Sequence, residues 1–175
     1  PPLVRACISE ASVVEMAKLG RPVLIGIQTL ETLRQRLQLY RDTMLEAGFS
    51  EAAVEEALDQ TWVQRGLYVC ESDTEAMETA DLALQRYRAH LLAARQKYNP
   101  GGVPPRQPGQ APPPGEVLAH AFLAGSPQRV AAQIAELKEA GVRNLLLNVN
   151  VGQIPPEKVE RSMRLFGDKV LPVTP

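Results

Sequence analysis

The N-terminal stretch constrains the fold most strongly, because it contains the pattern of one strand–helix–strand unit. The apolar segment Leu3–Ile8 predicts a buried strand, and the segment Val23–Ile27 predicts a second one. Between them, apolar residues recur at helical spacing until Gly20 ends the helix. A polar corner from Ser9 to Ser12 lies where the first strand ends. Its hydroxyls and the free amides of the helix start can cap the helix or hold an anion.

The rest of the chain repeats this alternation of strand and helix. Further buried strands are predicted over Trp62–Cys70 and Asn144–Asn150, and helices are predicted to begin after the caps Thr29, Ser50, Ser72 and Ser126. After an interruption described below, regular secondary structure is predicted to resume at Val117–Leu123, and a last helix follows Pro156. Strands that alternate with amphipathic helices predict an α/β fold with a parallel sheet and right-handed crossovers.

The number of units limits the architecture. We count four β/α units in the 175 residues, whereas a complete (β/α)8 barrel takes about 250 residues. We therefore expect a single domain, residues 1–175, with half of a TIM-barrel-like fold. Four strands alone expose two unpaired edges and an apolar face. Either a partner supplies the rest, or the chain is a piece of a longer protein, or it closes as a small open sheet.

One segment interrupts the alternation. Residues 99–115 contain seven prolines and four glycines, and Arg106 is the only charged residue among them. Such a composition cannot continue a helix or a central strand, so we expect a loop insertion. It is long for a connection within a compact domain, which leaves a mobile lid and a disordered insert as alternatives.

Composition excludes several classes of function. The net charge of −1 gives no basic footprint for nucleic acid, and no run of about eighteen apolar residues predicts a membrane span. Cys7 and Cys70 both lie in apolar segments, so we expect buried, reduced thiols and a cytoplasmic location. The sequence contains no metal-ligand cluster, no carboxylate pair at active-site spacing and no nucleophile elbow.

Several short motifs occur in an order and spacing that cover nearly the whole chain. They are Ala6–Ser12, Met16–Pro22, Leu39–Arg41, Tyr68–Ala76, Gly125–Pro127, Gly141–Leu147 and Ser162–Pro172. Together they resemble the carboxyl-terminal half of the bacterial luciferase-like flavin-dependent monooxygenases. The resemblance implies a TIM barrel of which this chain supplies about the last four β/α units, with flavin mononucleotide (FMN) at the carboxyl face of the strands.

The resemblance also implies which residues bind the cofactor. Ser9 and Ser12 match the hydroxyls that contact the flavin phosphate, although Ser9 can instead be only a helix cap. Gly26 and Ile27 correspond to the barrel wall at the isoalloxazine ring, where a glycine allows close approach of the backbone; an ordinary strand end is the alternative.

Other polar residues have weaker assignments. Asn148 and Asn150 alternate with apolar residues, so they can reach a ligand at the barrel mouth or remain solvated. His90 is expected on a helix surface, whereas His120 has a structural role or approaches the cleft. Arg106 can reach the phosphate or substrate if the loop closes over bound flavin; a freely solvated loop arginine is the alternative. The catalytic residues are unknown, because the resemblance places them in the half that this chain lacks.

The function implied by the resemblance is oxidation of a small organic substrate by reduced FMN and O2. A flavin reductase would supply the reduced flavin, and the chain would form a homodimer or associate with the missing half-barrel. Two alternatives stay open. One is a deazaflavin-dependent oxidoreductase of the same fold, and the other is a non-catalytic flavin-binding relative.

Overall fold

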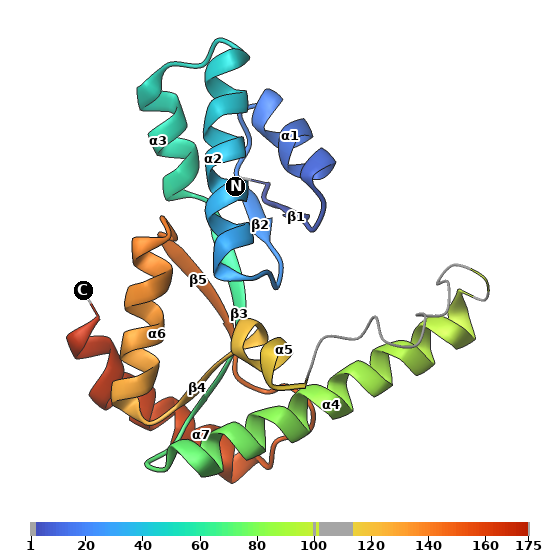
Figure 1. Cartoon of the computed structure of the whole chain (residues 1–175), viewed down its shortest axis with the longest axis vertical. Coiled ribbons are helices and arrows are strands. Elements are labelled where there is room, and N and C mark those ends of the chain that lie inside the picture. The colour runs from blue at the N-terminus through green and yellow to red at the C-terminus, as the bar shows by residue number, and fades with distance from the viewer. Residues whose placement is uncertain (1–2, 100, 102–113, 175) are drawn as a thin grey trace. The chain divides into compact units, whose positions relative to one another are not determined.

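The computed structural model of the chain describes residues 3–99, 101 and 114–174. Most of the predicted loop 99–115, including Arg106, lies outside these residues. The strands are β1 (Arg5–Cys7), β2 (Val23–Ile25), β3 (Trp62–Val69), β4 (Phe122–Gly125) and β5 (Asn144–Asn148) (Figure 1). The helices are α1 (Glu10–Lys18), α2 (Leu30–Glu46), α3 (Glu51–Asp59), α4 (Asp73–Tyr98), α5 (Pro114–Ala121), α6 (Pro127–Glu139) and α7 (Pro156–Leu165), followed by short helical turns over Phe166–Val170 and Leu171–Val173.

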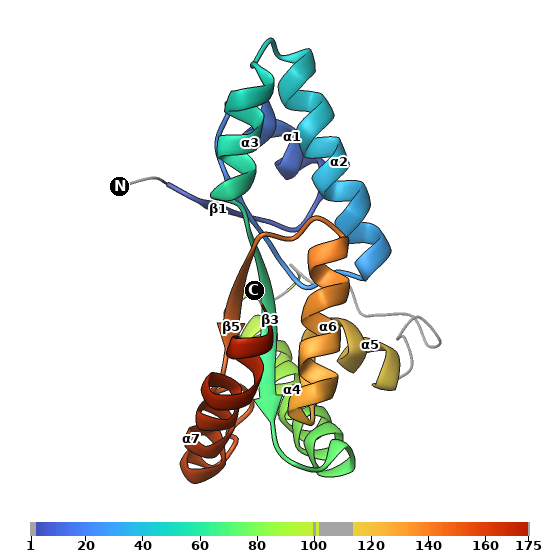
Figure 2. The same cartoon turned by 90° about the vertical axis from the view of Figure 1, so that its left-hand side faces the viewer.

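The strands form a parallel sheet, as the alternation predicts. The order is β1-β2-β3-β4. Strand β5 pairs with β3 (Figure 2). The chain consists of two compact units. The first contains the residues up to Arg65 together with Gln133–Leu147, and the second contains Gly66–Ala132 and the residues from Asn148 onward. The β1–β2 and β2–β3 pairings lie in the first unit, and the β3–β4 pairing lies in the second.

In the first unit, α1, α2 and α3 begin where the sequence predicts. Ser9, Thr29 and Ser50 each accept a hydrogen bond from the backbone N–H three residues ahead, so the predicted caps are confirmed. Apolar residues at helical spacing on α2 are buried, namely Leu33, Leu37, Tyr40 and Met44. Gly20 ends α1 with a positive φ of 63°, and a Cβ there would lie 2.6 Å from the Phe49 ring.

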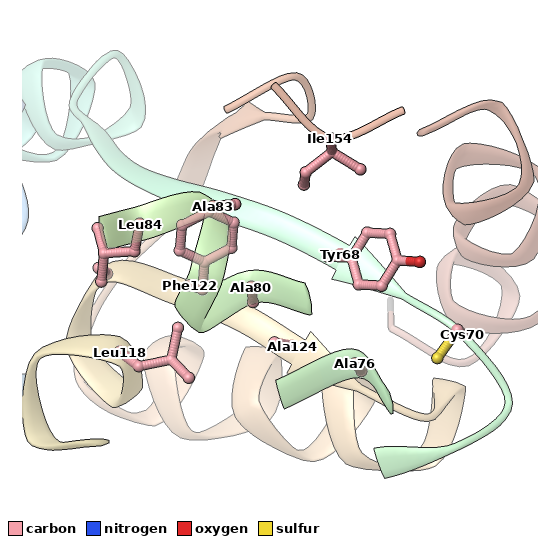
Figure 3. Packing of buried hydrophobic residues seen from close by; sticks show 11 residues of the cluster. Tyr68, Cys70, Ala76, Ala80, Ala83, Leu84, Leu118, Phe122, Ala124 and Ile154 are labelled. Atoms are coloured by element: carbon pink, nitrogen blue, oxygen red, sulfur yellow. The ribbon is translucent and has the colours of Figure 1, made fainter. Parts of the chain in front are cut away.

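In the second unit, α4 and α5 pack on β4. Their core is a hydrophobic cluster that also includes Ile154 from the loop before α7 (Figure 3). A Cβ on Gly66 of β3 would lie 2.6 Å from the Phe122 ring, so this close approach requires glycine. Ser162 of α7 is buried, and its Oγ accepts a hydrogen bond from the Val69 N–H at 2.7 Å.

The structure corrects several predicted boundaries. Strand β4 was not predicted, and five strands are present among the described residues instead of four. Leu3–Ile8 was expected to be a buried strand, but β1 covers Arg5–Cys7 only, and Leu3 and Ile8 are both 75% exposed. Both residues lie outside the strand, and no described element covers their side chains.

Three further boundaries move by a few residues. Strand β2 ends at Ile25, and β5 ends at Asn148 and is only half-buried. Helix α5 begins at Pro114, inside the expected loop. In the described part of the chain, no helix combines the length and the apolar character needed to cross a bilayer.

Candidate functional site

The structure brings Ser9 and Ser12 together at the carboxyl end of β1. Ser9 has extended backbone angles and is the N-cap of α1, and its Oγ accepts a hydrogen bond from the Ser12 N–H at 3.3 Å. The Ser9 hydroxyl lies 3.2 Å from Ser12 Oγ, and the Ser12 hydroxyl donates to the Ser9 carbonyl at 2.8 Å. Ser9 is exposed and Ser12 is half-buried, so a ligand can reach both hydroxyls.

The start of α1 also offers backbone donors. The N–H groups of Ser12 and Val13 bond to Ser9, whereas those of Glu10 and Ala11 have no hydrogen-bond partner among the described residues. Free amides at a helix N-terminus carry partial positive charge and favour an anion. The corner therefore combines two hydroxyls with two unused amide donors.

An arginine from α2 adds a full positive charge beside this corner. Arg36 Nη1 lies 3.2 Å from Glu10 Oε1, in an ion pair in which the Arg36 side chain is 14% exposed and the Glu10 side chain 73%. Arg36 Nη1 is buried, and among the described residues the Glu10 carboxylate is its partner, in an ion pair without good hydrogen-bond geometry. An anion at this corner would compete with the Glu10 carboxylate for Arg36. Sequence reasoning missed Arg36, because its position beside Glu10 depends on the packing of α1 against α2.

Gly26 and Ile27 follow the end of β2, next to the end of β1. The Gly26 N–H donates to the Cys7 carbonyl at 3.3 Å. A Cβ on Gly26 would meet only Ile8 at 3.6 Å, which is ordinary contact, so packing within this unit does not require glycine here. Ile27 is 43% exposed. All four predicted cofactor-binding residues thus lie at the carboxyl ends of two adjacent strands in the first unit.

A buried arginine holds the segment that follows Ile27. Arg65 of β3 is 3% exposed, and its Nη2 donates to the Gln28 carbonyl at 3.0 Å while its Nη1 donates to the Gln64 carbonyl at 2.7 Å. The described residues supply no carboxylate to it, and burial lowers the pKa of Arg65 to about 10. Sequence reasoning missed this residue, although it is the only charged side chain in the apolar run Trp62–Cys70.

The remaining candidates lie in the second unit. Asn150 and His90 line the same cavity, and His90 is exposed on α4 as predicted. Asn148 is half-buried at the end of β5, and His120 is half-buried on α5. Cys7 and Cys70 are free and buried, which confirms the prediction for the thiols. Among the described residues, no group of three His, Cys, Asp or Glu side chains is placed to hold a metal ion.

The fold defines a class: an α/β protein with half of a parallel (β/α)8 barrel and an open corner of hydroxyls and free amides at the carboxyl end of its first strand. The family model of the luciferase-like monooxygenases matches residues 1–144, and the chain belongs to this family. The resemblance found in the sequence is therefore confirmed. No curated protein matches the chain.

Solved structures agree with this assignment. The chain is similar to the monooxygenase RslO1 from Streptomyces bottropensis, with 25% identity and a TM-score of 0.70 over 98% of this chain and 48% of that one. It also resembles the oxygenating constituent of 3,6-diketocamphane monooxygenase from Pseudomonas putida, solved in complex with FMN, with 20% identity and a TM-score of 0.64 over 99% of this chain and 49% of that one.

A third similar structure has a different named cofactor. It is the coenzyme F420-dependent tetrahydromethanopterin reductase from Methanopyrus kandleri, with 18% identity and a TM-score of 0.60 over 99% of this chain and 51% of that one. The chain spans about half the length of these solved structures. Half of a TIM-barrel-like fold, as predicted, is consistent with this coverage.

Proposed function

We propose that this chain supplies the phosphate-binding half of the FMN site in a flavin-dependent monooxygenase. The observation that carries the proposal is the corner at the start of α1. There, two reachable hydroxyls and two free backbone amides lie at one helix start, and Arg36 pairs with Glu10 in the first turn of the same helix. A phosphate with two negative charges matches such a donor set. The carboxylate of Glu10 opposes the anion, and its exposed side chain can move away into solvent.

Each chain segment has a separate task in this proposal. Ser9 and Ser12 hold the phosphate, and the segment Gly26–Ile27 forms the wall beside the flavin ring. Arg65 keeps that wall in position through the Gln28 carbonyl. Bound reduced flavin supplies the oxygen chemistry. The other half-barrel, in the same polypeptide or in a partner, completes the site for a small organic substrate, and a flavin reductase delivers the reduced cofactor.

The phosphate contact is tested by comparing FMN with riboflavin, which lacks the phosphate. Both ligands quench or shift their fluorescence on binding, so both affinities are measurable with the same protein. We expect the double substitution Ser9→Ala and Ser12→Ala to weaken FMN binding by about tenfold or more, because charge-assisted hydrogen bonds are lost. Riboflavin binding should not change.

A matched control separates phosphate binding from helix capping. Ser50→Ala removes the cap of α3 in the same unit, at a similar cost of about 1 kcal/mol in stability. It should leave the affinity for FMN unchanged. If the double serine variant loses FMN and riboflavin equally, or if Ser50→Ala weakens FMN to the same extent, the proposed phosphate site is wrong.

Measurements of cofactor binding and of substrate oxidation distinguish the two alternative functions. Binding of coenzyme F420 in preference to FMN would favour a deazaflavin-dependent oxidoreductase. Tight FMN binding without substrate oxidation, once the second half-barrel is present, would favour a non-catalytic flavin-binding protein. An intact mass above the 19.1 kDa of this chain in natural material would identify the second half as part of the same polypeptide.

A further inference from the structure

The second unit contains a cavity that the FMN proposal does not use. It has a volume of about 780 Å³ and lies between the second half of α4 and the loop that leads from β5 to α7. Ligand sites in proteins commonly have volumes of about 300–1,000 Å³. The cavity is thus large enough for a small organic molecule.

The described residues that line the cavity are basic, amide-bearing or apolar, and none is acidic. Arg86 and His90 lie one helical turn apart on α4 and line the cavity, and Asn150 and Gln153 add side-chain amides from the loop. Arg86 forms no ion pair with any described residue. Tyr87 and Ile154 supply apolar surface. This combination favours a ligand with an apolar body and a negatively charged group.

The loop wall is held in an unusual backbone conformation. Gly152 and Gln153 have positive φ angles of 63° and 60°, and Gln153 is the only non-glycine residue with a positive φ in the described part of the chain. A Cβ on Gly152 would lie 1.8 Å from the Ala83 carbonyl oxygen, so the loop approaches α4 as closely as a glycine allows. Ile154 is buried in the hydrophobic cluster and anchors the loop there (Figure 3). The wall is therefore a packed part of the second unit.

We propose that this cavity binds a small organic anion, such as a carboxylate with an apolar ring or chain. Arg86 pairs with the anionic group, His90 and the two amides donate further hydrogen bonds, and Tyr87 and Ile154 contact the apolar body. This binding site does not depend on the proposed monooxygenase function.

The test uses 4-fluorobenzoate as the probe and 4-fluorobenzamide as its neutral counterpart. Line broadening in 19F NMR with the 175-residue chain gives both affinities. We expect the benzoate to bind about fivefold more tightly than the amide, because only the benzoate pairs with Arg86. Amide signals of Gly152 and Gln153 should shift when the benzoate is added.

Two arginine variants on the same helix separate a specific contact from general electrostatics. Arg86→Gln should abolish the preference for the benzoate over the amide, whereas Arg95→Gln should keep it, since Arg95 is exposed on α4 and does not line the cavity. Arg86 is also exposed, so its replacement should leave the fold intact, and dispersed NMR signals check this.

Three results would overturn the proposal. They are no broadening of the 4-fluorobenzoate signal, equal affinity for the benzoate and the benzamide, and an equal loss of the preference for the benzoate in the two arginine variants. None of them affects the comparison of FMN with riboflavin. If the double serine variant kept its affinity for FMN, the measurement of 4-fluorobenzoate binding would likewise be unaffected. The two proposals can therefore fail independently.

Discussion

Tyr40 is a buried residue whose ionisation couples stability to pH. Its side chain is fully buried on α2, and its hydroxyl donates to the Arg21 carbonyl at 2.7 Å. Burial raises the pKa of Tyr40 to about 12, whereas an unfolded tyrosine titrates near 10. Between about pH 10 and pH 12 the folded protein holds more protons than the unfolded one, so the free energy of unfolding should fall as the pH rises.

Tyr40→Phe isolates this effect. At pH 8 the variant should be less stable by about 1 kcal/mol, because the Arg21 carbonyl loses its hydrogen bond. As the pH rises from 10 to 11.5, urea unfolding should show the two proteins converge, since only the unmodified protein carries the tyrosine ionisation. The depressed pKa of Arg65 acts with the opposite sign in the same range, but it is present in both proteins and cancels. Parallel stability curves above pH 10 would contradict the prediction.

At the residue scale, sequence reasoning succeeds where the interaction is local. The caps Ser9, Thr29 and Ser50 act on an amide three residues away, so their spacing alone predicts them. Arg36 and Arg65 depend on neighbours far along the chain, namely Glu10 and Gln28. Only the folded structure brings such residues together, so the sequence alone did not predict the roles of Arg36 and Arg65.

At the scale of elements, one side-chain hydrogen bond joins α7 to β3. Ser162 is 3% exposed, and its Oγ accepts from the Val69 backbone N–H at 2.7 Å. Ser162→Ala would leave that N–H buried without an acceptor, so we expect a loss of about 1–3 kcal/mol in the free energy of unfolding. Urea unfolding measures the loss.

Native-state hydrogen exchange adds a local readout for the same contact. The Val69 amide should exchange faster in Ser162→Ala than in the unmodified protein, because its hydrogen bond is absent. Met163→Ala is the control, since this neighbour on α7 is half-exposed and its truncation should leave Val69 protected. Unchanged exchange at Val69 in the serine variant would mean that the contact does not hold α7 in place.

The elements that the sequence failed to predict share a physical cause. Strand β4 has only four residues and follows α5 directly, so no polar turn separates the two patterns. The segment Leu3–Ile8 has the composition of a buried strand, yet Leu3 and Ile8 are exposed, because an apolar side chain is buried only where another element covers it. Periodicity identifies the type of an element, but it does not identify what covers the element.

At the scale of the whole molecule, the count of β/α units predicted half of a barrel, and the chain spans about half the length of its solved relatives. Parallel sheets are normally covered on both faces and rarely leave an apolar edge exposed. The exposed strand β1 is consistent with this deficit.

The exposed edge predicts association of the isolated chain. Since β1 pairs with β2 alone among the described strands and Leu3 and Ile8 are exposed, we expect a mass well above 19.1 kDa at micromolar concentration in analytical ultracentrifugation. Placing lysines at both positions, Leu3→Lys and Ile8→Lys, should shift the protein toward the monomer, because charges that flank an edge strand oppose its pairing and replace two exposed apolar side chains. Leu92→Lys changes an equally apolar, half-exposed residue on α4 and should not. A monomeric unmodified chain, or equal dissociation by the α4 variant, would show that β1 is not the surface through which this half-barrel is completed.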